Sequence, residues 1–339
     1  MKKYLISAII LAAVLILLVV AFFIYQFPRV ADKAIVPNLG ELNYGWDEWP
    51  GVLPYLVAND KGFFSANGLK VKMVKIETNS QMVSKLIDGQ IDFTGDITLV
   101  DTLKAYSRGE NLQVINVTDY SNGGDGIVAK KSIAKVADLK GKRVAVELGS
   151  LNEKLLFYAL EKNDLELRDV QRVDLSAAEA AQAFIRGEVD AAVTYEPGLS
   201  EAVAAGGVKI FSTALTPGLI IDVGAMRNDY INQNPEKVQA VLRSYFMGLD
   251  YIKNNPQESY AIGAKYFNVS EQEFADYLSG LEWVDLRGNL LSMSYSLGYE
   301  SLYGNGSLAN RYLREIDIIS SDIDIGEVIR PEFVRALTK

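Results

Sequence analysis

The chain has 339 residues, of which 49% are hydrophobic and 23% charged, a composition that suits one or two globular domains. It contains neither cysteine nor histidine, which excludes disulfides, thiol nucleophiles, Ser-His-Asp triads and histidine-ligated metals, so we expect no cofactor and no metal. The 34 basic and 43 acidic residues give a net charge of −9, which argues against nucleic acid as a partner.

An uncharged apolar run of 22 residues, from Tyr4 to Tyr25, follows Lys2 and Lys3. At about 1.5 Å rise per residue, a helix of this length spans a hydrocarbon core of ~30 Å. The run is longer than an ordinary signal-peptide core, and no good cleavage site follows it. We therefore expect residues 1–30 to be a retained membrane anchor, with a cleaved signal as the alternative. The two lysines predict a cytoplasmic N-terminus and an extracytoplasmic remainder.

After a short tether, strands and helices alternate. Residues 69–77 (LKVKMVKIE) alternate apolar and polar side chains, which is typical of a strand with one buried face. The other predicted elements of this part are a strand and its loop at 40–49, helices at 53–60, 81–88 and 98–107, and strands at 91–95 and 112–118. This rhythm predicts an α/β sheet that is at least partly parallel.

The glycine-rich segment SNGGDG (121–126) predicts a crossing into a second lobe, and Pro217-Gly218 predicts a crossing back. Between them we expect a strand within 138–150, helices at 152–162, 177–186 and 198–205, and strands at 170–174 and 189–194. The chain then returns through 219–226 and continues as helices at 235–253, 256–266, 270–279 and 293–313. The predicted lobes are 35–121 with 222–339, and 122–221.

One αβ unit occurs twice. Residues 81–98 (QMVSKLIDGQIDFTGDIT) and 179–196 (EAAQAFIRGEVDAAVTYE) each join a helical run to a short strand that ends in an acidic residue. Asp92 and Asp190 occupy the same place in the two copies, and we interpret them as structural. Two similar units predict two similar lobes, and a cleft between such lobes is a place to hold a small molecule.

Four segments together resemble the periplasmic substrate-binding proteins of ABC importers, in the group that serves sulfonates, taurine, nitrate and thiamine precursors. They are PYLVANDKGFFSANGLKV (54–71), LIDGQIDFTGD (86–96), DLKGKRVAVELGS (138–150) and AFIRGEVDAAVTYEP (183–197). The resemblance covers about residues 40–290. It implies two α/β lobes with a ligand in the hinge cleft, closure around that ligand, and a permease and an ATPase as partners. We expect a monomer.

Candidate ligand residues follow the strands, where loops and helix starts face such a cleft. Each has a structural alternative, such as capping a helix or pinning a loop. Of the two tryptophans after the first strand we favour Trp46 over Trp49 as a stacking wall. The remaining candidates are Asn79, Ser80, Asp96, Thr98, Asn122, Asp125, Gly149, Ser150, Glu196 and Asp222. The resemblance places Glu196, within Tyr-Glu-Pro, toward the cleft.

These loops carry seven acidic residues and no lysine or arginine: Asp47, Glu48, Asp96, Asp125, Glu147, Glu196 and Asp222. Buried acids without a basic partner repel a bare anion, which disfavours nitrate and bicarbonate. An amine-bearing, zwitterionic or aminopyrimidine-like ligand fits better, and a sulfonate stays an option. A ligand-binding subunit of a membrane sensor is an alternative function. An enzyme of the same fold that makes the thiamine pyrimidine is disfavoured, because such enzymes use histidine.

Overall fold

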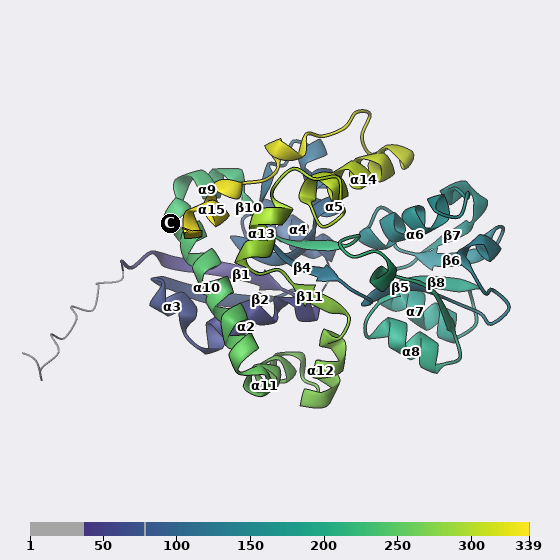
Figure 1. Ribbon diagram of the computed structural model, residues 1–339, viewed down its shortest axis with the longest axis horizontal. Coiled ribbons are helices and arrows are strands. Elements are labelled where there is room, and N and C mark those ends of the chain that lie inside the picture. The colour runs from purple at the N-terminus through teal and green to yellow at the C-terminus, as the bar shows by residue number, and fades with distance from the viewer. Residues whose placement is uncertain (1–36, 78, 339) are drawn as a thin grey trace, which may run out of the picture. The chain divides into compact units, whose positions relative to one another are not determined.

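The computed structural model describes residues 37–77 and 79–338, which form two β-sheets flanked by helices (Figure 1). The first sheet has the order β11-β4-β10-β3-β1-β2, and the second has the order β7-β6-β8-β5-β9. The strands are β1 (Gly40–Trp46), β2 (Leu69–Lys75), β3 (Phe93–Thr98), β4 (Leu112–Ser121), β5 (Asp125–Ala129), β6 (Arg143–Val146), β7 (Gln171–Asp174), β8 (Ala191–Tyr195), β9 (Val208–Ser212), β10 (Ile221–Arg227) and β11 (Leu281–Trp283).

Helices precede and follow these strands along most of the described chain. They are α2 (Leu53–Asp60), α3 (Phe63–Ala66), α4 (Asn79–Ile87), α5 (Leu99–Ser107), α6 (Leu151–Glu161), α7 (Ala177–Ile185), α8 (Gly198–Ala204), α9 (Asn228–Gln233), α10 (Pro235–Asn254), α11 (Pro256–Phe267), α12 (Glu271–Leu278), α13 (Leu286–Ser292), α14 (Leu302–Glu315) and α15 (Pro331–Arg335). The predicted helix at 293–313 is wrong in its first half. Ser301 caps α14 by accepting a hydrogen bond from the Tyr303 amide, so the helix begins only there.

The chain passes between the sheets twice. It leaves the first sheet at Ser121 and enters the second at Asp125, and it returns from β9 to β10 through residues 213–220. We call the part built on the first sheet lobe 1 and the part built on the second sheet lobe 2. Both sheets are mixed, because β1, β2 and β3 pair in parallel whereas β10 runs antiparallel to both of its neighbours.

Each lobe has its own hydrophobic core. In lobe 2, α6 packs on one face of the sheet through Leu155 and Leu156, and α7 and α8 cover the other face through Phe184 and Leu199. Helix α14 lies beside both lobes, since its Leu308 belongs to the lobe 2 core and its Tyr312 to the lobe 1 core. The predicted lobe boundaries at 121/122 and 221/222 stay a prediction.

The two copies of the repeated unit have the same backbone role. In lobe 1, the Asp92 carboxylate accepts a hydrogen bond from the Asn43 amide (2.8 Å), and the Asp92 amide donates to the Asn43 carbonyl (2.9 Å). In lobe 2, Asp190 makes the same two bonds with Arg143 (3.1 and 2.9 Å). These aspartates therefore tie each repeat to the adjacent parallel strand.

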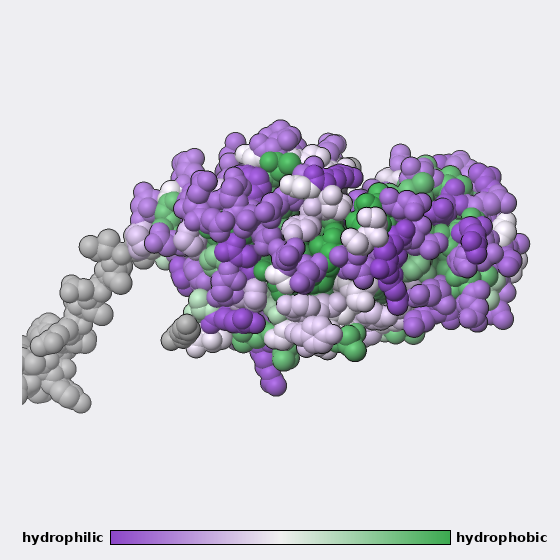
Figure 2. Space-filling view, turned by 90° about the horizontal axis from the view of Figure 1, so that it is seen from above, coloured by the Kyte–Doolittle hydropathy of each residue, from purple (hydrophilic) through white to green (hydrophobic). Residues whose placement is uncertain are grey.

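Figure 2 shows the face that carries α14, where most of the surface is hydrophilic and hydrophobic residues gather near the boundary between the lobes. Within residues 37–77 and 79–338, no helix is both long and apolar enough to cross a membrane. The anchor predicted at residues 1–30 lies outside the described residues.

Candidate functional site

Aspartates from both lobes meet where the strands of the two sheets end. We define the acidic junction as Asp96, Asp119, Asp125 and Asp222, whose side chains are at most 6% exposed. Asp96 lies on the repeated strand β3, two residues before its end at Thr98. Asp119 and Asp222 lie on β4 and β10, and Asp125 begins β5 of lobe 2. Burying four carboxyl groups together is unfavourable without cations or protons between them, so this arrangement requires compensation.

Asp119 and Asp222 are directly paired across two antiparallel strands, and Thr98 is the partner of Asp222 on its other side. Directly opposite residues have Cβ atoms about 5 Å apart on one face of the sheet, so the two carboxyl groups lie side by side. Burial raises the pKa of Asp119 to about 7. Burial, followed by the charge of Asp119, also raises the pKa of Asp222. Both shifts favour the protonated form of the pair.

The other two members lie on opposite sides of the lobe boundary. The Asp96 carboxylate accepts a hydrogen bond from the Asp47 amide at 3.2 Å, and burial together with the Asp47 charge raises its pKa. The backbone amide of Asp125 donates to the Ser121 hydroxyl at 3.1 Å. Burial raises the pKa of Asp125 to about 7, and the charge of Glu196 adds to this effect.

Aromatic side chains connect the lobes beside these acids. The Trp49 indole N–H points to the Asp119 carboxylate, at 3.2 Å from Oδ1 and 3.4 Å from Oδ2. The ring of Trp49 meets the ring of Tyr195 from lobe 2 edge-on, with centroids 6.1 Å apart. Tyr195 is in turn the cross-strand partner of Asp125. A continuous row thus runs from Asp222 through Asp119, Trp49 and Tyr195 to Asp125.

A buried cation lies against this row. Lys154, in the first turn of α6, is 1% exposed, and its ammonium donates to Oδ1 of Asn305 on α14 at 3.0 Å. Burial lowers the pKa of Lys154 to about 8, and the charges of Asp222, Asp101 and Asp125 oppose that shift. The candidate loops themselves carry no lysine or arginine, and Lys154 adds a basic residue from helix α6. A lysine in a helix's first turn is disfavoured by the helix dipole, which is the signal that sequence reasoning missed.

The description "NMT1/THI5 like" matches residues 49–259, which is well over half of the chain. The chain belongs to the NMT1/THI5-like family. This confirms the resemblance predicted from the sequence, and the matched range includes every residue of the acidic junction.

The chain is also similar to two curated relatives and to one solved structure. A protein of Escherichia coli (strain K12) named for binding aliphatic sulfonates is 32% identical over 180 residues, covering 52% of this chain and 56% of its own length. The taurine-binding periplasmic protein of the same strain is 26% identical over 189 residues, covering 55% of this chain and 58% of its own length. The matched segments thus span less than two thirds of either relative.

The crystal structure of the periplasmic aliphatic sulphonate binding protein from Escherichia coli superposes with a TM-score of 0.70. It covers 86% of this chain and 92% of that one at 21% identity. This likeness confirms the predicted two-lobed α/β fold of periplasmic binding proteins. Both relatives are named as binding proteins, which supports the expectation that this family member is not an enzyme.

The structure places the two predicted tryptophans differently, and their roles toward a ligand stay predictions. Trp46 is 5% exposed and packs edge-on against Tyr266 and obliquely against Phe267 of α11, so its ring belongs to the lobe 1 core. Leu42, Tyr44 and Trp46 are buried side chains two residues apart on β1, and that period of two is the sequence signal for a core position. Trp49, three residues later, is the tryptophan that reaches lobe 2.

Several predicted residues serve local structure. Thr98 caps α5, since its hydroxyl donates to Asp101 at 2.6 Å and accepts from the Asp101 amide. Ser150 caps α6 in the same way by accepting from the Asn152 amide at 3.1 Å. The Glu196 carboxylate, partly exposed, accepts hydrogen bonds from the amide and hydroxyl of Ser200. Their roles toward a ligand stay predictions.

The remaining candidates are scattered. Asn79 donates to Asp101 at 3.0 Å, and the Gly149 carbonyl accepts from Lys104 of lobe 1 at 2.5 Å, so this loop contacts the other lobe. Ser80 and Asn122 have exposed side chains and are not brought to the junction by these contacts. Of the predicted acids, Asp96, Asp125 and Asp222 are buried together, and Thr98 is buried beside Asp222.

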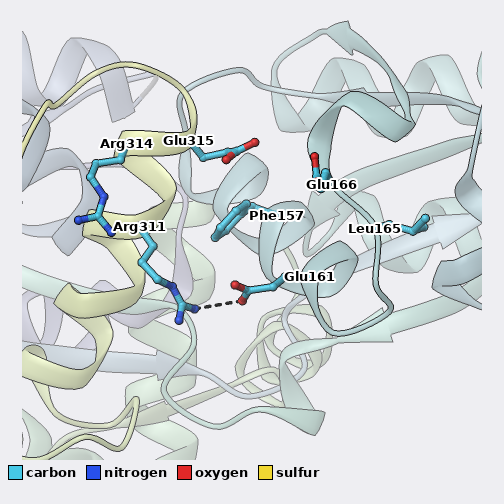
Figure 3. Close-up of a pocket in the computed structure, with 7 residues that line it drawn as sticks. All are labelled: Phe157, Glu161, Leu165, Glu166, Arg311, Arg314 and Glu315. Atoms are coloured by element: carbon cyan, nitrogen blue, oxygen red, sulfur yellow. Dashed lines mark hydrogen bonds and ion pairs between the residues drawn. The ribbon is translucent and has the colours of Figure 1, made fainter.

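A separate pocket of about 510 Å³ lies between α6 and α14. Figure 3 shows that charged side chains line it and that Arg311 is paired with Glu161 at 3.0 Å. Its lining residues are Phe157, Glu161, Leu165, Glu166, Arg311, Arg314 and Glu315. None of the predicted site residues is among them.

Proposed function

We propose that this chain is the extracytoplasmic solute-binding component of an ABC importer, and that it captures an amine-bearing small molecule at the acidic junction. The family membership and the names of its relatives support the importer role, and a permease and an ATPase would be the partners. The ligand class rests on one observation: four buried carboxyl groups from both lobes surround the row formed by Trp49 and Tyr195.

The chemistry of the junction favours a cationic nitrogen. A bare anion placed there would face four acids and a single buried ammonium group, that of Lys154. A cationic nitrogen can instead donate hydrogen bonds to the carboxylates, and charge-assisted bonds of this kind are among the stronger ones in proteins. The indole of Trp49 and the phenol ring of Tyr195 offer aromatic surface beside them, which favours an organic cation over a small inorganic one.

Ligand entry also explains how both lobes would be drawn together. Asp125 belongs to lobe 2, whereas Asp96, Asp119 and Asp222 belong to lobe 1. A cation between them bonds to both lobes only when the lobes are closed, so binding stabilises the closed arrangement by its differential affinity for that state.

A thermal-shift screen of the full-length chain tests this proposal. The panel contains alkylamines, aminocarboxylates, an aminopyrimidine, taurine, alkanesulfonates and nitrate. A probe that binds only the native state adds about 2.7 kcal/mol of stability at a hundred times its Kd. We expect shifts with the amine-bearing probes, and we expect Asp222→Asn to lose these shifts. Glu48→Gln is the matched control, because Glu48 is exposed and paired with Lys75. Shifts with nitrate or simple alkanesulfonates alone would overturn the ligand assignment.

We further propose that the apolar run from Tyr4 to Tyr25 anchors the chain in the membrane with one N-terminal pass. Its length and the two lysines before it support this proposal. We expect the protein to stay in the membrane fraction after a high-salt wash and to keep its first residues. A soluble protein whose N-terminus lies near residue 32 would show that the segment is a cleaved signal.

A further inference from the structure

The ammonium group of Lys154 is buried without being neutralised by a direct ion pair. Among the described residues it has one hydrogen-bond partner, the side-chain oxygen of Asn305, and it forms no ion pair. A lysine ammonium carries three N–H donors, so two of them lack a protein partner. A buried charge with a single neutral partner is costly, which indicates that the arrangement serves more than packing.

The ammonium group is also held in place. The Asn305 side chain that accepts from Lys154 donates through its amide nitrogen to the carbonyls of Gly218 (2.6 Å) and Leu219 (3.0 Å). These residues lie in the second chain crossing, four and three positions before Asp222. Gly218 has a φ of +75°, and a Cβ atom there would lie 2.6 Å from the backbone of Glu300, so the crossing is fixed against the start of α14. Lys154 is thereby fixed relative to the acidic junction.

The acids near Lys154 act on its charge without pairing with it. Asp222, Asp101 and Asp125 all oppose the lowering of its pKa. Among the described residues, none of them forms an ion pair with its ammonium group. Asp119 accepts from the Trp49 indole, and Asp222 lies beside Asp119. A ligand that contacts both Lys154 and these aspartates needs an acceptor toward Lys154 and a donor toward the aspartates.

We propose that Lys154 is a specificity-determining residue, which selects ligands that carry an acidic group in addition to a cationic nitrogen. This inference rests on the proposed function, since it concerns the same site. The acidic group of the ligand accepts hydrogen bonds from the two free N–H donors of Lys154, and the nitrogen of the ligand donates to Asp119, Asp222 or Asp125. A simple amine leaves Lys154 unsatisfied.

Paired probes test this inference on the full-length chain. Each aminocarboxylate of three to six carbons is compared with the alkylamine and the carboxylate of the same length, and taurine with ethylamine and ethanesulfonate. Affinities come from calorimetry. In the wild type we expect the best zwitterion to bind at least about tenfold more tightly than its matched amine, the effect of a hydrogen bond to a charged group.

The variant that decides between a ligand contact and a structural role is Lys154→Met, whose side chain has a similar length but no charge. If Lys154 contacts the acidic group, the ratio of zwitterion to amine affinity falls to about one. If Lys154 is only a structural counter-charge, both affinities change together and the ratio stays as in the wild type, which overturns the inference. Lys154→Arg should retain a preference for the zwitterion. Lys162→Met, at the exposed end of the same helix, should behave as the wild type.

Two further results keep the outcomes distinct. Should Lys154→Met fail to fold, as judged by circular dichroism, Lys154→Gln replaces it in the same comparison. If wild-type protein binds amines and zwitterions equally well, the inference fails while the proposed function stands. If neither amines nor zwitterions bind, the proposed function fails and the inference falls with it.

Discussion

The two copies of the repeated αβ unit share one acid and differ at the other. Asp92 and Asp190 form the same pair of backbone hydrogen bonds with the adjacent parallel strand, so this position belongs to the fold of both lobes. Near the end of the strand, Asp96 is 4% exposed within the acidic junction, whereas Glu196, just after its strand, is partly exposed and accepts hydrogen bonds from Ser200 of α8.

The two copies show how a repeated αβ unit can support a site to which the two lobes contribute different residues. The lobes need the same strand tether, and a substitution there would weaken either of them. The second acid, Asp96 or Glu196, does not form this strand tether, so it can have a different role in each lobe. Lobe 1 therefore contributes most of the buried carboxyl groups, while lobe 2 contributes Asp125 and the ammonium group of Lys154.

The largest effect that follows from this comparison concerns Asp96. Asp96→Asn keeps the shape of the side chain and an acceptor for the Asp47 amide but removes the buried charge. Removing one partner of a buried charge pair costs about 2–5 kcal/mol, so we expect Kd for the best amine-bearing probe to rise roughly 30-fold or more. Calorimetry measures it. Wild-type affinity in Asp96→Asn would show that the first copy contributes no charge to the site.

A second contrast is in proton binding. Burial raises the pKa values of Asp119 and Asp125 to about 7, whereas the hydrogen bond from Lys130 lowers the pKa of Asp190. A carboxyl group with a raised pKa binds its proton more tightly in the folded state, so its contribution to stability is lost as pH rises toward and through 7. Asp190 is ionised in both states above pH 5 and adds no slope there.

We therefore expect the free energy of unfolding of the unliganded protein to decrease by roughly 5 kcal/mol between pH 5 and pH 8, about half of it from each of Asp119 and Asp125. Urea unfolding at a series of pH values measures this. Asp125→Asn should reduce the dependence by about half, because Asp119 remains, and Asp190→Asn should leave its slope unchanged. A stability that rises over this range would mean that the junction acids are ionised and paired in the folded protein.

Most of the fold was predictable because its signals are local. The apolar period of α10 and the alternating side chains of β2 gave bounds within two residues of those observed. Strands β9 and β11 were missed, since each is a short segment without clear alternation, Val208–Ser212 and Leu281–Trp283. The start of α14 was missed because the Ser301 cap determines it, and the apolar pattern shows no break at that position.

The candidate site was predictable only in part. Asp96, Asp125 and Asp222 follow predicted strands and crossings, so their positions in the sequence pointed to the boundary between the lobes. Asp119 was missed because its importance comes from the register that pairs it with Asp222, and that register depends on how β10 inserts between β3 and β4. Lys154 was missed because its partner, Asn305, is 151 residues away in the sequence.

A smaller effect, similar in both lobes, is expected at the shared acids Asp92 and Asp190. Asp92→Ala and Asp190→Ala each remove an acceptor from a backbone amide of the adjacent strand, so each should lower the free energy of unfolding by about 1–2 kcal/mol. Urea denaturation gives the values, and probe affinity should stay within about twofold of the wild type. If one of the two variants lost ligand binding while remaining stable, the position would be functional in that lobe and the symmetry would be broken.

The smallest effect is expected at Glu196, although the family resemblance places this residue toward the cleft. Its carboxylate already accepts two hydrogen bonds from Ser200, and its partial exposure allows water to screen its charge. Glu196→Gln preserves an acceptor for the Ser200 amide and should raise the Kd of the best probe by less than about threefold. Calorimetry beside Asp96→Asn makes the comparison direct. A loss of tenfold or more would show that the acid faces the ligand in both copies, and the asymmetry would then lie in exposure alone.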